Sequence, residues 1–229
     1  MKALILFAIM LPAIGYAQSR SLAQFVTWQP NPGMEKQFEE GYKRHLDWHA
    51  KAGDTWNWYG WFFISGPRAG QFMDATIDHA WGDFDNPVDP AGDHADNEQN
   101  TVPYASFIGA AKLNAVTSLS RPGKYGLRSK YMKMITLQVL NEYSATWRIR
   151  NLRNRVEDKK GINFFVTYKT IDGGRMDHWY ILIGADSWAD FEACVDAGDK
   201  LLDSGVFKSM TSETLLYRHD LSRFPEEKR

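Results

Sequence analysis

The sequence AWGDFDNPVDPAGD at residues 80–93 recurs in altered form as SWADFEACVDAGD at residues 187–199. The shared residues lie 107 positions apart, and they are Trp81, Asp83, Phe84, Val88 and Asp89, matched by Trp188, Asp190, Phe191, Val195 and Asp196. A fixed spacing of this kind indicates an internal duplication. We expect each Trp and Phe to anchor the start of a helix on a sheet. The Asp between them would lie in the first helical turn, where a carboxylate complements the helix N-terminus. Two copies of an acid-bearing site are not needed to explain the repeat.

The segments around both copies have the same predicted order. In the first half, runs of β-branched and aromatic residues predict strands at 22–28, 55–65 and 71–77, and Gly53 ends a helix at 33–52. A second helical region begins at WGDF, and a last strand or helix-to-strand passage covers 110–120. The second half follows the linker SRPGKYGLRS, and its predicted segments are 131–140, 144–160 (ended by Gly161), 162–171, 176–184, 186–205 and 207–221.

The order β-α-β-β-α-β, stated twice, is that of a ferredoxin-like unit. Such a unit covers one face of its sheet with helices, and the bare faces of two sheets can close on each other. We therefore predict an α+β fold in which two tandem ferredoxin-like repeats, residues 18–120 and 121–229, form an α/β barrel. The hairpins at 55–77 and 163–183 should then belong to the same barrel.

The segment QPNPGMEKQFEEGYKRHLDWHAKAG at 29–53, which follows the first strand, carries a family resemblance. With this layout the chain resembles a tandem member of the dimeric α/β-barrel superfamily and is similar to NIPSNAP-like and EthD-like domains. The resemblance spans almost all of residues 20–220 and includes no signature catalytic motif. It implies that the repeats pair within the chain or that two chains pair as a homodimer. It also implies that a haem between helix and sheet is one cofactor this fold can hold.

The first 17 residues, MKALILFAIMLPAIGYA, are expected to be a signal peptide. The apolar run after the single charge is too short to cross a bilayer, and small residues precede a cut before Gln18. We therefore expect a periplasmic or secreted protein with no stable membrane anchor after cleavage. The formal net charge of −1 argues against nucleic acid as a partner. The only cysteine, Cys194, leaves no intrachain disulfide to form.

The helix at 33–52 contains the residues that best indicate a binding site, His45 and His49. At 100° per residue they share a stripe with Met34, Phe38, Gly41, Tyr42 and Ala52. Two histidines four residues apart on one helix face are a common way to hold a metal, but such a site needs a third ligand. Asp74, Asp78 or His79 of the neighbouring strand could supply it.

The alternative is that His45 and His49 are core histidines satisfied by hydrogen bonds. We favour this alternative and assign no metal, because buried polar groups are usually just satisfied. At a spacing of 108 residues the pair aligns with Arg153 and Glu157. The duplicate therefore lacks the pair, so the fold does not require it, and any site lies in the first repeat.

The strand TWNWYGWFF at 55–63 has two apolar faces, Trp56, Trp58, Gly60 and Phe62 on one and Asn57, Tyr59, Trp61 and Phe63 on the other. Core packing explains most of this pattern. The functional interpretation is an aromatic-lined cavity in the barrel, in which Gly60 leaves room for a flat apolar ligand. The predicted ligand-binding residues are His45, His49, Trp56, Trp58 and Phe62.

The polar segment VDPAGDHADNEQN at 88–100 is interpreted as a solvated loop. Its acidic and His residues, which are Asp89, Asp93, His94, Asp96 and Glu98, lack the spacing of an EF-hand calcium loop. The chain also has no G-x-S-x-G, P-loop or H-E-x-x-H motif. No catalytic residue is assigned.

Three functions are consistent with these features. The leading one is a binding protein for a small apolar molecule. The second is an oxygenase- or isomerase-like enzyme, or a haem- or metal-binding protein that uses His45 or His49. The third is a structural or assembly role. The sequence leaves open both the cofactor and whether the protein is an enzyme.

Overall fold

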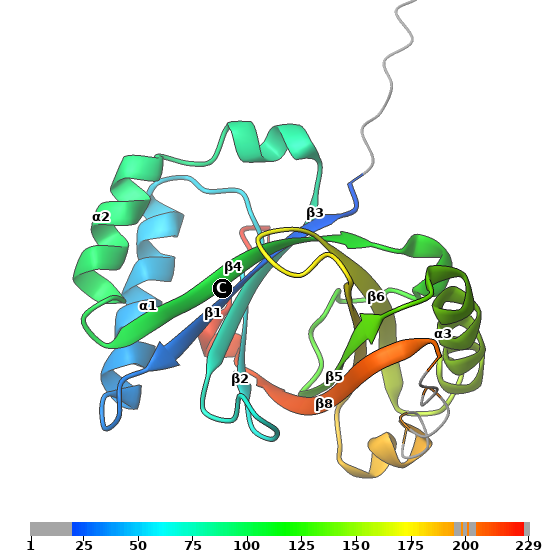
Figure 1. The fold of residues 1–229 in the computed structure, drawn as a ribbon. Helices are drawn as coiled ribbons and strands as arrows, with labels where there is room; N and C mark the ends of the chain where they lie inside the picture. Colours follow the sequence, from blue (N-terminus) through cyan, green and yellow to red (C-terminus); the bar gives the residue numbers. More distant parts are fainter. Residues whose placement is uncertain (1–19, 195–197, 199–200, 202–204, 227–229) are drawn as a thin grey trace, which may run out of the picture.

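The computed structural model describes residues 20–194, 198, 201 and 205–226 (Figure 1). The strands are β1 (Leu22–Pro30), β2 (Tyr59–Phe63), β3 (Phe72–His79), β4 (Ala105–Ala115), β5 (Tyr131–Val139), β6 (Ile162–Asp172), β7 (His178–Ala185) and β8 (Phe207–Tyr217). The α-helices are α1 (Glu35–Lys51), α2 (Pro90–Asn100) and α3 (Glu142–Val156). Short 3-10 turns are η1 (Trp81–Asp85), η2 (Thr117–Leu119), η3 (Ala189–Cys194) and η4 (His219–Leu221).

The strands close into one antiparallel barrel in the order β1-β3-β2-β8-β5-β7-β6-β4. Each half of the chain supplies four adjacent strands, and the pairs β2–β8 and β4–β6 join the halves. The helices pack outside the barrel, α1 and α2 on one side and α3 on the other (Figure 1). The predicted α+β fold of two tandem ferredoxin-like repeats in one α/β barrel is confirmed, including the presence of both hairpins in the same barrel.

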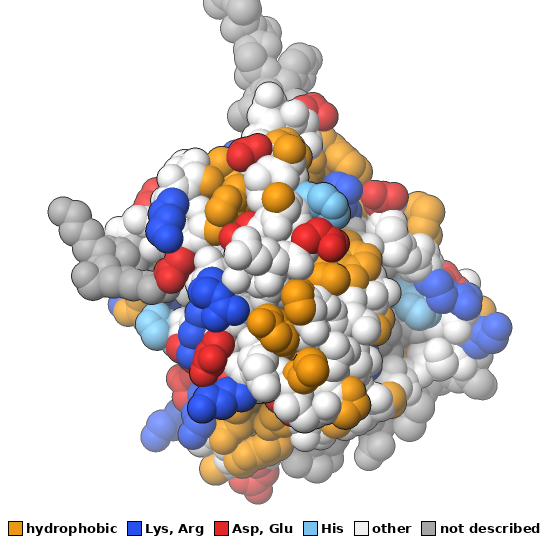
Figure 2. All heavy atoms as spheres, turned by 90° about the vertical axis from the view of Figure 1, so that its left-hand side faces the viewer, with side chains coloured by type: hydrophobic (Ala, Val, Ile, Leu, Met, Phe, Trp, Pro, Cys, Tyr) orange, Lys and Arg blue, Asp and Glu red, His pale blue; other side chains and the backbone are white. Residues whose placement is uncertain are grey.

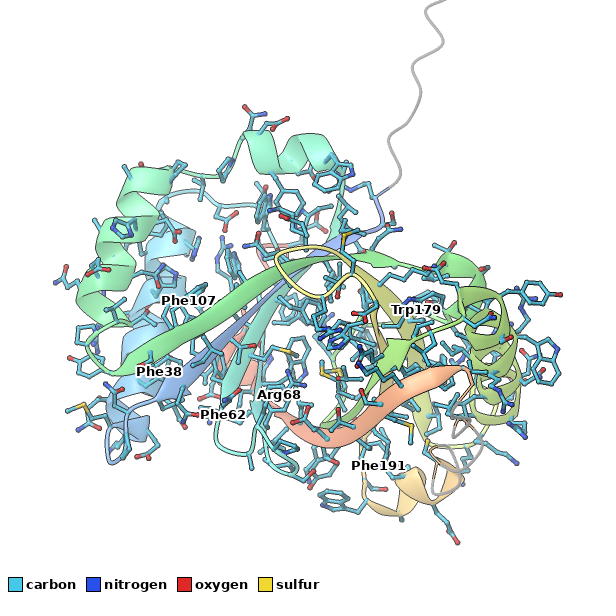
Figure 3. All side chains as sticks on the ribbon, in the orientation of Figure 1. Phe38, Phe62, Arg68, Phe107, Trp179 and Phe191 are labelled. Atoms are coloured by element: carbon cyan, nitrogen blue, oxygen red, sulfur yellow. The ribbon has the colours of Figure 1, made fainter. Side chains whose placement is uncertain are left out.

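Side chains on successive strand positions separate into an interior core and an outer layer. Tyr59, Trp61 and Phe63 belong to the core that fills the barrel, whereas Trp58 and Phe62 pack in the cluster under α1. The predicted two faces of this strand are therefore confirmed. In Figure 3, Phe38 and Phe62 lie between α1 and the sheet. A third cluster, which includes Trp179, packs the second half of the sheet against α3.

Helix α1 ends in a Schellman motif, as the glycine after it predicts. Gly53 has a φ of 76°, its N–H donates to the carbonyl of Ala50, and the N–H of Asp54 donates to the carbonyl of His49. The chain therefore turns back sharply and holds Asp54 beside His49. Helix α3 ends at Val156, four residues earlier than predicted, and Gly161 instead leads into β6.

The segment predicted to be a solvated loop is mostly helix, so that prediction was wrong. Residues 90–100 form α2, whose start is capped: the side chain of Asp89 accepts a hydrogen bond from the N–H of Gly92, and Pro90 occupies the first turn. The helix has no buried residue of its own, and because its composition is polar, the sequence shows no apolar stripe that would predict a helix. Its surroundings, not its hydrophobic pattern, stabilise it.

The expected anchoring role of the repeated tryptophans was also wrong. Trp81 and Trp188 are 56% and 55% exposed, whereas Phe191 is buried. Asp83 does lie in the first turn of η1, where its carboxylate accepts a hydrogen bond from the N–H of Ala80. The parts of the repeated string at 81–85 and 189–194 thus form 3-10 turns after a hairpin in both halves, and the first copy continues into the start of α2.

Two predictions fall outside the described residues. The signal peptide at residues 1–17 does so completely, and the second helix of the second repeat, at 186–205, does so in large part beyond η3. Within the part of the chain that the structure describes, no helix is long and apolar enough to cross a membrane.

Candidate metal centre and aromatic pocket

Two glycines allow α2 to lie unusually close to α1. A Cβ at Gly41 would lie 1.8 Å from the carbonyl oxygen of Asn100, at the end of α2. A Cβ at Gly92, in the first turn of α2, would lie 2.2 Å from the carboxylate of Asp89 and 2.9 Å from the ring of Trp48. Close approach at both ends places the acidic face of α2 over the histidines of α1. Figure 2, which faces this side of the molecule, shows charged, His and apolar side chains interspersed on the surface.

His45 and His49 are both buried and point toward each other. Their Nε2 atoms are 3.2 Å apart. Oδ1 of Asp93, from α2, lies 3.5 Å from Nε2 of His45 and 3.4 Å from Nε2 of His49. These three ligand atoms form the only group of at least three His, Cys, Asp or Glu ligands with metal-like spacing among the described residues.

The opposite ring nitrogens of the two histidines face carboxylates. Nδ1 of His45 lies 2.8 Å from Oδ2 of Asp96, and Nδ1 of His49 lies 2.9 Å from Oδ2 of Asp54. The second contact is close but does not have the geometry of a hydrogen bond. A carboxylate behind a histidine fixes the tautomer in which Nδ1 carries the proton and Nε2 carries a lone pair. This is the arrangement found around metal-bound histidines.

The two Nε2 atoms share a hydrogen bond if one of them carries the proton of its ring. If Nδ1 is protonated on both rings instead, three acceptors converge on one point, and a cation between them would relieve the repulsion of the two Nε2 lone pairs and the carboxylate of Asp93. The nearby donor is the side-chain amide of Asn97, whose Nδ2 lies 3.2 Å from Nε2 of His45. Its Oδ1 is buried and has no partner among the described residues. Rotated by 180°, this amide would present an oxygen to a bound cation instead.

The surroundings of His45 disfavour its protonated form. Burial lowers the pKa of His45, and the neighbouring His49 lowers it further, although Asp96 and Asp93 act in the opposite direction. Burial would raise the pKa of Asp54, but the adjacent His49 and the hydrogen bonds from Trp56 and Trp58 outweigh it and leave the pKa lowered. The site thus combines a His45 that resists protonation with a fixed negative charge on Asp54.

A pocket of about 260 Å³ adjoins this cluster. His49, Asp54 and Asp93 line it on the side of the cluster. The other lining residues are Gln24, Trp56, Trp58, Phe84, Pro87, Val88, Pro90 and Lys112. The pocket lies outside the barrel, on the helix-covered side of the sheet. The barrel interior next to this strand is filled by Tyr59, Trp61 and Phe63.

The structure brings four of the five predicted ligand-binding residues together. His45, His49, Trp56 and Trp58 surround the cluster or the pocket, and the rings of His49 and Trp58 are 4.4 Å apart. Phe62 packs against Phe38 and Phe72 under α1 and does not line this pocket.

The expected role of Gly60 was wrong. A Cβ there would lie 2.3 Å from the carbonyl oxygen of Leu221 and 2.9 Å from the ring of Phe72. The glycine therefore makes room for η4 and for a core ring. No ligand space opens at this position.

The third ligands suggested by the sequence lie elsewhere. Asp74 is buried under α1, where it accepts a hydrogen bond from Nε1 of Trp28 at 3.0 Å. His79 packs on Trp56 with ring centroids 4.3 Å apart and lies 3.4 Å from Asp83. Neither belongs to the metal-like group, and nor does Asp78. Asp93 takes the third position instead, and sequence reasoning missed it because its helix was read as a loop.

The second repeat shows what these positions hold when there is no site. Helix α1 begins at Glu35 and helix α3 at Glu142. Counted from these first residues, the positions of His45 and His49 in α1 correspond to Leu152 and Val156 in α3, which are buried. The alignment with Arg153 and Glu157 was therefore off by one residue, and those two form an ion pair with each other. The fold therefore accepts aliphatic core residues at both positions, and the histidine pair is not a requirement of the fold.

A haem does not fit these histidines. Each Nε2 atom faces the other ring and the carboxylate of Asp93, and each ring is held from behind by a further carboxylate. A porphyrin ligated by either histidine would have to occupy the 3.2 Å gap between the two Nε2 atoms. The residues present suit a single small cation.

No family model and no curated protein matches the chain. Solved structures do match the chain. A protein of Lactobacillus acidophilus named "putative monooxygenase" is 10% identical with a TM-score of 0.61, covering 90% of this chain and 97% of its own. An anthrone oxidase-like protein is 14% identical with a TM-score of 0.63, covering 92% and 95%.

A mutant chlorite dismutase from Candidatus Nitrospira defluvii is 10% identical with a TM-score of 0.60, covering 89% and 94%. At such identities these similarities establish the fold and leave the NIPSNAP-like or EthD-like assignment a prediction. By its fold, this chain is an α+β barrel similar to those of these structures.

Proposed function

We propose that this protein binds one divalent transition-metal ion through Nε2 of His45, Nε2 of His49 and a carboxylate oxygen of Asp93, and acts on a small molecule in the adjoining pocket. The supporting observation is the set of ligand separations, 3.2, 3.4 and 3.5 Å. Ligands about 2.0–2.1 Å from a tetrahedral ion are about 3.3 Å from one another. The proposal replaces the purely structural role that the sequence favoured.

The number of ligands supports a catalytic rather than a structural metal site. Structural zinc sites are closed by four protein ligands, whereas catalytic ones keep a fourth position for water or substrate. Because His49 and Asp93 also line the pocket, a fourth position on that side would be reachable from it. A bound ion would supply Lewis acidity or an acidified water. Asp54 and Asp96 would hold the histidines in their ligating tautomer.

Metal addition is expected to stabilise the wild-type protein and to leave the ligand variants unaffected. Zn²⁺ at a hundredfold excess over Kd should add about 2.7 kcal/mol by mass action. His45→Ala, His49→Ala and Asp93→Asn should each weaken Zn²⁺ binding at least a hundredfold, because two protein ligands rarely retain the ion. Binding should also weaken at acid pH, because the ligating imidazole is neutral, and the lowered pKa of His45 moves the loss at this ligand below the usual imidazole range. Isothermal titration calorimetry and thermal unfolding measure these effects.

Two histidines provide matched controls. His94 is exposed on α2 next to Asp93, and His79 is buried but outside the cluster. His94→Ala and His79→Ala should retain Zn²⁺ binding, which separates the proposed site from adventitious surface binding and from general loss of a buried ring. Equal Zn²⁺ affinity in the wild type and in Asp93→Asn would overturn the proposal.

An oxygenase is the second candidate. Two histidines and one carboxylate with open positions form the ligand set of non-haem iron(II) oxygenases. The structural neighbours named as a monooxygenase and as anthrone oxidase-like give this reaction class some support. Metal analysis of the purified protein and anaerobic titration with Fe²⁺ distinguish an oxygenase from an enzyme that uses the metal only as a Lewis acid. Stoichiometric Fe²⁺ bound more tightly than Zn²⁺, with oxygen uptake on exposure to air that Asp93→Asn abolishes, would favour the oxygenase.

A further inference from the structure

Lys112 places a positive charge at the base of the aromatic pocket. It pairs across strands with Gln24, and their chain neighbours Phe25 and Leu113 face the barrel interior. Because side chains alternate along a strand, Gln24 and Lys112 both face outward, beneath the pocket that they line. Lys112 is the only Lys or Arg among the described residues that line it.

The aromatic side chains that line the pocket are flat and held in place by their neighbours. Trp58 donates from Nε1 to Asp54 at 2.7 Å, and Trp56 packs between His79 and Phe84 with ring centroids 4.3 and 5.7 Å away. All three pocket rings, Trp56, Trp58 and Phe84, are half-buried. Fixed, partly exposed indole and phenyl faces are favourable surfaces for a planar ligand, since aromatic pairs gain energy beyond the area they bury.

The positive charge of Lys112 is available to a ligand. Its Nζ lies 3.3 Å from Oδ2 of Asp172, which is strongly exposed, and 5.3 Å from the centre of the Phe84 ring. An ion pair with an exposed carboxylate contributes at most about 1 kcal/mol. A ligand carboxylate next to an aromatic wall can therefore replace Asp172. At the other end of the pocket, Asp54 is already bonded to Trp56 and Trp58.

We propose that this pocket binds a planar aromatic carboxylate, with its ring among Trp56, Trp58 and Phe84 and its carboxylate on Lys112. The inference rests on the proposed function only in that the metal centre forms the opposite end of the pocket. The volume of about 260 Å³ is near the lower limit for small-molecule sites and suits one or two fused rings. This ligand class differs from the small apolar molecule expected from the sequence, because it carries a charge.

The test uses 2-naphthoate and 2-naphthamide, which share a shape and differ in charge. Binding to the purified full-length protein is followed by calorimetry and by tryptophan fluorescence, with and without Zn²⁺. The wild type should bind the carboxylate at least tenfold more tightly than the amide. Lys112→Met should remove this preference by weakening only carboxylate binding, and Lys112→Arg should retain it.

Lys169 offers a closely matched control in the second repeat. Its side chain is 29% exposed against 26% for Lys112, its Nζ pairs with the exposed Glu142 at 3.0 Å, and it lies over the ring of Trp179. Lys169→Met should leave both affinities unchanged. Equal affinities for carboxylate and amide, or a preference that survives Lys112→Met, would overturn the inference. Failure to bind Zn²⁺ with the preference intact would overturn the metal proposal alone.

Discussion

Gly41→Ala is expected to separate α2 from α1 and to weaken metal binding together with stability. The new methyl carbon would lie 1.8 Å from the carbonyl oxygen of Asn100. Because the obstacle is backbone, no rotamer change relieves the clash, and the end of α2 has to move. Overpacking costs about 1–3 kcal/mol and occasionally more, and we expect the upper part of this range. In a protein of this size, 3 kcal/mol lowers Tm by about 6–12 °C.

The effect on metal binding follows from the helix that carries Asp93. Asp93, Asp96 and Asn97 all belong to α2, so a displaced α2 takes one ligand and two supporting side chains away from the histidines. We expect Zn²⁺ affinity to fall at least tenfold although no ligand has changed. Thermal unfolding and calorimetry on the same samples measure both losses.

Gly109→Ala is the control for Gly41→Ala. Gly109 lies in β4, and a Cβ there would meet nothing within 4 Å. The variant should differ from the wild type by no more than about 0.5 kcal/mol and should bind Zn²⁺ normally. Wild-type stability and affinity in Gly41→Ala would show that the close contact between α1 and α2 does not position the site.

Asp74→Asn is expected to stabilise the protein at pH 8 and to leave it unchanged near pH 4.5. Asp74 is buried, and burial raises its pKa to about 7, although the hydrogen bond from Trp28 acts in the opposite direction. In the unfolded chain the same carboxyl ionises near pH 3.9. Between these values the folded protein holds a proton that the unfolded chain has released. Stability therefore falls as the pH rises from about 4 to about 7.

The size of the effect follows from the difference between the folded pKa of about 7 and the unfolded pKa of about 3.9. Each unit corresponds to 1.36 kcal/mol, so Asp74 contributes at most about 4 kcal/mol of pH-dependent destabilisation, and we expect about 2–4 kcal/mol. Asparagine keeps the acceptor for Trp28 and never ionises, so this part of the pH dependence should disappear. Chemical denaturation at pH 4.5, 6 and 8 measures the difference between variant and wild type.

Asp47→Asn is the matched control for Asp74→Asn, because Asp47 lies on the exposed face of α1. It should show a nearly constant difference from the wild type across the three pH values. If Asp74→Asn behaves in the same way, the buried carboxyl is not protonated in the folded state.

The sequence was most informative about the barrel, because strand alternation and glycine turns are local signals. The faces of residues 58–63 and the turn at Gly53 followed directly from side-chain period and backbone freedom. A second helical region was expected from WGDF onward, but the part of it that forms α2 was read as a loop for a related reason. This helix buries none of its residues, so it has no apolar stripe, and its cap at Asp89 and Pro90 was the only local indication. Without that helix, Asp93 could not be recognised as a partner of the histidines.

Taken alone, the sequence determined the repeat, the order of elements and the shared face of His45 and His49. These depend on residues close together along the chain, whose geometry a helix or strand fixes. The tertiary structure decided which groups meet those histidines. Asp93 and Asp96 lie over them because Gly41 and Gly92 let two helices approach, and Lys112 reaches the pocket through the register of β1 and β4. Such meetings depend on packing between distant segments, which no local pattern encodes.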